Sequence, residues 1–99
     1  MMIARVIGTL VSSQKEATLE GLRLLVCHPV NAAGEKTGSA LVAADAVGAG
    51  VGEMILYATG SSARQTIATQ NRPVDAVVMA IVDQWEVGGE VKYRKSEDA

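Results

Sequence analysis

Apolar residues along the chain fall into short runs bounded by glycine, proline or polar segments, and most of the runs are rich in β-branched side chains. This pattern is typical of strands rather than of long helices. The runs predict five or six strands, which we place at residues 3–12, 22–30, 39–45, 53–60, 74–87 and 90–95.

Local signals refine this outline at four places. Gly8 interrupts the first run and predicts a bulge or a sharp bend there. Residues 31–38 carry Asn and two Gly between apolar runs, which predicts the turn of a hairpin. Ser62 followed by Gln65 fits a capping box and predicts the start of one short helix. Residues 74–87 hold the most sustained β-branched content, as expected of a central strand.

The end of the chain alternates between apolar and polar residues after the pair Gly88 and Gly89. Residues 90–95 are therefore expected either to form an edge strand or to reach a neighbouring subunit. We expect residues 96–99 to be disordered. Together these elements predict a mainly β fold: a single domain over residues 1–99, built as a small closed barrel of the oligonucleotide-binding (OB) type with five to six strands and one short helix.

Composition narrows the class of protein. With 48% hydrophobic residues and only three aromatic ones, the core must consist of Val, Ile, Leu, Ala and Met. The net charge of −2 gives no general attraction to nucleic acid or to an anionic membrane. The single Cys27 excludes an internal disulfide, and the first residues lack the pattern of a secretory signal. No apolar run approaches the ~20 residues that span a bilayer, so we expect a soluble cytoplasmic protein.

The stretch DAVGAGVGE, residues 45–53, resembles a phosphate-binding loop at first sight. Its glycines, Gly48, Gly50 and Gly52, have the spacing G-x-G-x-G instead of G-x-G-x-x-G, and a strand-like run follows instead of a helix. The glycines therefore predict a tight crossover between strands that needs positive φ, with Asp45 capping the turn. GEKTG, residues 34–38, lacks the adjacent Gly-Lys-Ser/Thr of a P-loop. We expect no bound cofactor.

Other reactive residues do not assemble into a site. Cys27 and His28 are neighbours in a predicted strand and point to opposite faces, and acidic metal ligands are missing nearby. We therefore expect no catalytic residue and no metal site, with Cys27 buried and His28 near a strand end or an interface. Glu16 and Glu20 are expected to face solvent. The segment GSSAR, residues 60–64, is either an ordinary helix cap or a turn whose amides and hydroxyls attract an anion.

Four blocks of sequence carry a resemblance to a known family: IARVIGTLVSSQKEATLEGLRLLV, VAADAVGAGVGE, GSSAR and RPVDAVVMAIVD. In order and spacing they are similar to the pentameric vertex proteins of bacterial microcompartments, the EutN/CcmL family, from about Ile3 to Trp85. The resemblance implies an OB-like barrel that assembles into a five-fold ring with a narrow axial pore. Its partners would be four further copies and the hexameric shell proteins of a carboxysome or catabolic metabolosome. The pore-lining segment implied is Gly60, Ser61, Ser62, Ala63 and Arg64.

Two other classes of function remain to be weighed. A barrel of this type often binds single-stranded nucleic acid, but that function relies on aromatic stacking platforms and a basic groove. With 3% aromatic residues and a negative net charge, this chain offers neither. A small enzyme would need a nucleophile, a base and an orienting group, and the sequence supplies no such set. The non-catalytic shell protein is the favoured prediction.

Overall fold

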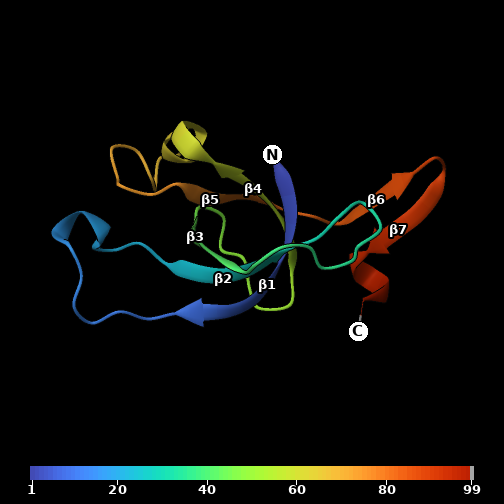
Figure 1. Ribbon diagram of the computed structural model, residues 1–99, viewed down its shortest axis with the longest axis horizontal. Helices are drawn as coiled ribbons and strands as arrows, with labels where there is room; N and C mark the ends of the chain where they lie inside the picture. The colour runs from blue at the N-terminus through green and yellow to red at the C-terminus, as the bar shows by residue number, and fades with distance from the viewer. Residues whose placement is uncertain (99) are drawn as a thin grey trace.

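Five strands close into a barrel in the computed structural model, which describes residues 1–98 (Figure 1). The order around the barrel is β1-β2-β3-β5-β4, and β4 returns to pair with β1. Only β3 and β5 are parallel. This confirms the mainly β, closed-barrel prediction. The barrel strands are β1 (Met2–Leu10), β2 (Leu24–Pro29), β3 (Leu41–Asp45), β4 (Met54–Thr59) and β5 (Ala76–Ile81).

A bulge lets β1 serve two neighbours. Strand β1 pairs with β4 from Met2 to Arg5 and with β2 from Ala4 to Leu10, with a shift in the β2 register between Val6 and Gly8. The bulge lies next to Gly8, as predicted from the sequence. Its extra residue bends β1 around the barrel. The predicted hairpin is also present, since β2 pairs antiparallel with β3 from Leu24 to Cys27.

The barrel interior is filled by small and medium side chains from alternating positions of the strands. Alanine at several inward positions lets opposite walls approach closely, so the interior is a packed core and not a channel. The buried residues of this core are Ala4, Val6, Leu25, Cys27, Ala43, Ala49, Ile55, Tyr57, Ala76 and Val78.

A second apolar cluster covers the outside of the wall at β4 and β5. Strand β5 is buried on both faces, with Val77 in the outer cluster and Val78 in the barrel, each 0% exposed. This double burial accounts for the strong β-branched run. The run is not one strand, however: β5 ends at Ile81, and the backbone N–H of Val82 still donates to the carbonyl of Met54 in the barrel (2.8 Å).

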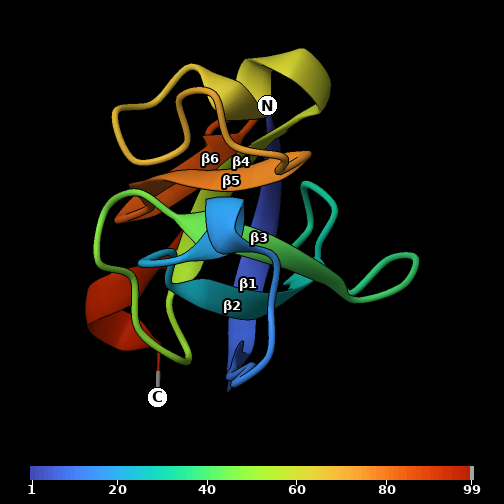
Figure 2. The same ribbon diagram turned by 90° about the vertical axis from the view of Figure 1, so that its left-hand side faces the viewer.

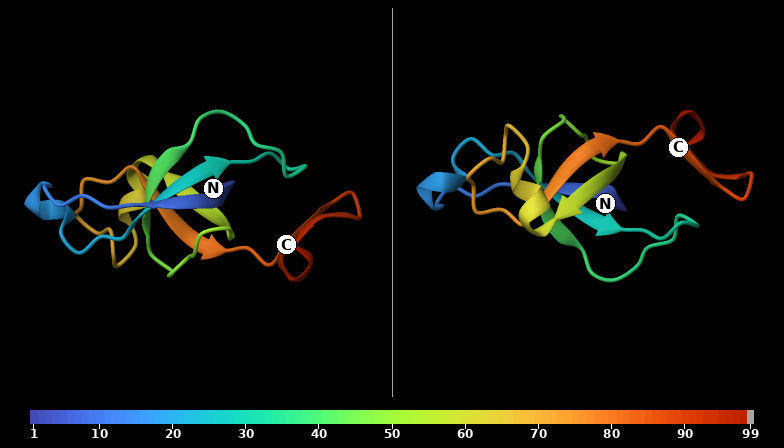
Figure 3. Two further views of the ribbon diagram at one scale, coloured as in Figure 1. Left: turned by 90° about the horizontal axis from the view of Figure 1, so that it is seen from below. Right: turned by 90° about the horizontal axis from the view of Figure 1, so that it is seen from above.

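After that contact the chain leaves the barrel and forms a separate hairpin of β6 (Gln84–Val87) and β7 (Glu90–Arg94) (Figures 1 and 3). The Trp85 indole N–H donates to the carbonyl of Ala32 at 2.7 Å, and its ring stacks on Tyr93 with centroids 5.1 Å apart. Residues 90–94 therefore pair within their own chain.

The helical elements differ from the prediction. They are three 3-10 helices, η1 (Ala17–Leu19), η2 (Gly60–Arg64) and η3 (Lys95–Glu97), and residues 1–98 contain no α-helix. The predicted capping box is wrong: Thr59 occupies the N-cap without a side-chain hydrogen bond, and Gln65 is the C-cap. The chain turns directly from β4 into η2, and five residues of tight helix leave no room for the reciprocal bonds of the box.

The end of the chain, where we expect disorder over 96–99, is described as far as residue 98. Residues 96 and 97 lie in η3, and the carboxylate of Asp98 pairs with the Arg5 guanidinium at 2.8 Å. The Arg5 guanidinium also lies 5.9 Å from the centroid of the Tyr93 ring. The Asp98 contact joins the segment to β1, while residue 99 lies outside the described residues.

Candidate functional site

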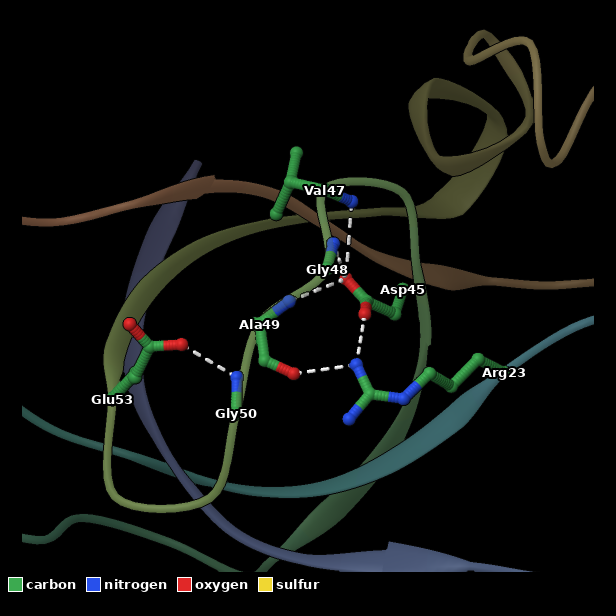
Figure 4. Close-up of polar contacts among 7 residues, drawn as sticks. All are labelled: Arg23, Asp45, Val47, Gly48, Ala49, Gly50 and Glu53. Atoms are coloured by element: carbon green, nitrogen blue, oxygen red, sulfur yellow. Dashed lines mark hydrogen bonds and ion pairs between the residues drawn. The ribbon is translucent and has the colours of Figure 1, made fainter.

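The glycine loop, residues 46–53, joins β3 to β4 across one end of the barrel (Figure 4). Ala49 at its centre is fully buried in the barrel core. Two backbone bonds fix the loop to β1: the N–H of Gly52 donates to the Val6 carbonyl at 2.7 Å, and the N–H of Val6 donates to the Glu53 carbonyl at 2.9 Å. The loop therefore acts as the plug of the barrel.

Asp45 organises the first half of this loop (Figure 4). Its Oδ1 accepts hydrogen bonds from the backbone N–H groups of Val47, Gly48 and Ala49, at 3.0, 3.0 and 3.3 Å. Its Oδ2 accepts from Arg23 Nη1 at 2.5 Å, and the carboxylate is 2% exposed. The amides that a phosphate would need are thus already occupied by a buried side chain, which argues against nucleotide binding here.

Arg23 completes the arrangement, and sequence reasoning missed it. The same Nη1 that pairs with Asp45 also donates to the carbonyl of Ala49 at 2.5 Å. Arg23 lies 22 residues before Asp45, and no local pattern signals the contact. It becomes visible only once β2 and β3 are paired, with Leu24 opposite Ala44.

The three glycines of the loop have two different reasons to be glycine. Gly48 and Gly52 have φ of 79° and 93°, in the left-handed region that side chains with a Cβ disfavour. Gly50 lies outside that region, but a Cβ there would be 3.3 Å from Glu53 Oε1. Backbone conformation at two positions and this close approach at the third account for the three glycines.

Replacing Gly52 with Val is therefore expected to lower the free energy of unfolding by about 1–3 kcal/mol, because a β-branched residue is strained at this φ. Gly50→Ala serves as the comparison, since only the mobile end of Glu53 must shift to admit its Cβ. Chemical denaturation of both variants is the measurement. Equal losses in the two variants would contradict the assignment of strain to position 52.

Glu53 ties the other half of the loop to the end of the chain. Its Oε1 accepts from the Gly50 N–H at 2.5 Å (Figure 4). Its Oε2 accepts from Lys95 Nζ at 2.6 Å. The bond from Lys95 and then the bond from Gly50 lower the pKa of Glu53, and the same contact with Glu53 raises the pKa of Lys95. The glycine loop and η3 are thus linked electrostatically.

This link predicts an acid-dependent contribution to stability. Because the pKa of Glu53 is depressed on folding, its contribution is present above its ordinary pKa of 4.5 and is lost as the pH falls through the folded value. Glu53→Gln removes the charge and keeps the shape. We expect the variant to lose less stability than the parent between about pH 6 and about pH 3 in thermal melts. An identical acid dependence of the two proteins would contradict this role.

The GSSAR segment lies on η2, which directly continues β4. The Gly60 N–H donates to the carbonyl of Asp75 at 2.9 Å, and Ala63 is fully buried in the outer apolar cluster. Ser61 and Ser62 are exposed. Arg64 is exposed too, but its Nη1 points back to the Val74 carbonyl of its own chain, at 3.4 Å. The segment therefore exposes the hydroxyls of Ser61 and Ser62, while the buried Ala63 anchors it to the barrel.

The remaining reactive residues are arranged as a structural role requires. Cys27 is fully buried, and burial, followed by the negative charge of Asp45, raises the pKa of its thiol to about 11. His28 is the neighbouring residue of β2 and stands opposite Arg5. Within residues 1–98 no three His, Cys, Asp or Glu side chains converge as metal ligands. The same residues contain no helix of the length and apolar character needed to cross a membrane.

The three aromatic residues are also unavailable as a stacking surface for bases. Tyr57 lies in the barrel core, Tyr93 is 8% exposed, and Trp85 stacks on Tyr93 outside the barrel. Binding of single strands on such barrels depends on aromatic platforms on the outer face. The nucleic-acid alternative therefore has no support from the side chains of the barrel wall.

Comparison with known proteins agrees with this geometry. The family model described as "Ethanolamine utilisation protein EutN/carboxysome" matches residues 1–83. The carboxysome shell vertex protein CcmL of Gloeobacter violaceus is 44% identical over 97 residues, covering 98% of this chain and 97% of that protein.

Two solved structures are similar over nearly their whole length. The structure of Gloeobacter violaceus CcmL has a TM-score of 0.93 at 44% identity and covers 98% of this chain and 100% of that one. The GrpN pentameric microcompartment shell protein from Rhodospirillum rubrum has a TM-score of 0.80 at 41% identity, covering 88% of this chain and 99% of that one.

Proposed function

Because this chain belongs to the EutN/CcmL family, we propose that it is a structural shell protein whose pentamers cap the vertices of a polyhedral bacterial microcompartment. The observation that carries the proposal is the likeness, over nearly the whole chain, to vertex proteins of carboxysomes and to a pentameric shell protein. The protein would accordingly reside in the shell of a microcompartment in the cytoplasm.

The physical need for such a protein follows from geometry. A flat layer of six-fold tiles cannot close into a polyhedron unless some positions become five-fold, so the corners need a pentagonal tile. A ring of five copies repeats one heterologous contact around an axis, which requires two different surfaces on each copy. Hexameric shell proteins of the same compartment are the neighbours that such a tile meets.

The vertex role requires no chemistry, and the side chains agree with that. The amides of the glycine loop are used by Asp45 and Glu53, and Cys27 is buried with a raised pKa. We propose that the protein is not an enzyme. Its contribution to the compartment is closure of the shell.

The GSSAR segment is proposed to border the axial opening of the ring. Support comes from its small side chains, since bulky ones from five copies would collide near an axis, and from the exposure of Ser61 and Ser62. Such an opening would be too narrow for a folded protein or a nucleic-acid strand, and small ions and metabolites would be the species that pass.

Native mass spectrometry of the purified full chain tests the proposed function. The expected result is a species of five copies that persists on dilution to micromolar concentration. A protein that stays monomeric at all concentrations would overturn the vertex role. A ring of six copies would overturn the vertex role, and the protein would remain a shell protein of another position.

A further inference from the structure

Exposed apolar side chains lie on two opposite flanks of the barrel. Figures 2 and 3 place the glycine loop and the loop of residues 65–72 on one side, and the connection from β2 to β3 with the start of β3 on the other. The first flank carries Val51, 61% exposed, and Ile67, 99% exposed. Ile67 is thus the most exposed large apolar side chain of the described residues, and its own chain does not cover it.

The second flank has a recess instead of a projection. Strand β3 pairs with β5 only at Ala44 and Asp45, so the described residues provide no strand partner for Leu41–Ala43 on that side. A groove of about 490 Å³ occupies this gap. Its lining is Leu41, Val42, Thr59, Gly60, Asp75 and Ala76.

The groove has an apolar rim that continues along the sheet. Val42 is 43% exposed and stands opposite Val26 of β2 in the register. The groove also reaches Gly60, the first residue of η2. A contact made in this groove therefore lies beside the segment that the proposed function assigns to the opening.

We propose that Ile67 of one copy packs into the groove at Val42 of the next copy. This inference rests on the proposed function, because the groove would be occupied by a second copy of this chain. The support for a second copy is the likeness to GrpN, a pentameric shell protein that is 41% identical to this chain. A closed ring needs two unlike surfaces facing in different directions. A projecting flank opposite a recessed one meets that need, whereas two identical patches would produce a two-fold dimer.

Three single variants of the full chain test the pairing by native mass spectrometry. Val42→Glu places a charge in the groove, and Ile67→Glu places a charge on the projecting side chain. Val91→Glu is the matched control on the outer hairpin, because Val91 has the same 43% exposure as Val42. The parent and the Val91 variant are expected to form pentamers. The Val42 and Ile67 variants are expected to lose at least about tenfold of the pentamer, since each charge would be buried unpaired.

Mixing the two disrupted variants gives a sharper result. The Val42→Glu chain keeps an intact Ile67, and the Ile67→Glu chain keeps an intact groove, so the mixture retains one good contact. The second contact would place two glutamates together, and the ring cannot close. The expected product is a heterodimer of the two variants, which neither forms alone. Two disrupted variants that stay monomeric in the mixture would overturn the pairing.

A second measurement covers the case in which a glutamate variant fails to fold. The double variant Val42→Cys, Ile67→Cys is expected to give disulfide-linked chains on oxidation, up to a closed set of five, while the buried Cys27 stays reduced. Absence of linked chains in an intact pentamer overturns the inference and leaves the proposed function standing. Val42→Glu and Ile67→Glu variants that remain pentameric would likewise overturn the inference and leave the proposed function standing. A groove that is filled by a hexameric shell protein instead of a second copy would do the same. A parent that forms no pentamer instead overturns the proposed function itself.

Discussion

Replacing Asp45 with alanine is expected to lower the free energy of unfolding by about 3–5 kcal/mol. The change removes the acceptor of three backbone N–H groups and leaves Arg23 without its anionic partner. Because Ala49 plugs the core next to these groups, the barrel end is expected to open with the loop. Chemical denaturation followed by circular dichroism gives the measurement.

The control for Asp45 is Glu90→Ala, which removes an exposed ion pair with Lys92 on the outer hairpin. Exposed pairs of this kind contribute about 0–1 kcal/mol, so this variant should melt close to the parent. If Asp45→Ala also melted close to the parent, the buried carboxylate would not be the organiser of the loop.

Replacing Ser62 with tryptophan is expected either to prevent the ring of five or to close its axial opening. Five added indole rings would converge on one axis if the GSSAR segment borders the opening. Ser61→Trp should behave alike, because both serines are exposed on η2. Native mass spectrometry reports the assembly, and electron microscopy of the ring reports the opening.

Ser96→Trp provides the matched control for this substitution. Ser96 is also an exposed serine of a short 3-10 helix, η3, but it lies at the far end of the chain from η2. The control ring should assemble and keep its opening. A Ser62→Trp ring with five copies and an unchanged opening would place the segment away from the axis.

Features of this fold that depend on neighbouring residues could be predicted from the sequence. The bulge at Gly8, the hairpin between β2 and β3 and the cap formed by Asp45 all arise from residues close in the chain. The strand predicted directly after the glycine loop is also present, since the run that follows residue 52 forms β4.

The errors share a different cause, because distant contacts decide those elements. The run of residues 74–87 was predicted as one strand, whereas the bond of Val82 to Met54 and that of Trp85 to Ala32 hold its two parts, β5 and β6, on different neighbours. Arg23 likewise meets Asp45 only through the pairing of β2 with β3. The serine and glutamine of the expected capping box fit a helix pattern, but the burial of Ala63 selects the tighter helix that starts at Gly60.

The hairpin of β6 and β7 has a consequence for how such shells diversify. It has its own strand register, and the family model ends at residue 83, just before β6 begins. Its tip, Gly88 and Gly89, is exposed. Insertions or drift at this tip would leave the pairing of all five barrel strands untouched. The sequence of this tip can therefore change while the barrel keeps its structure. A peptide tag between Gly88 and Gly89 is a practical way to label the protein without altering its core.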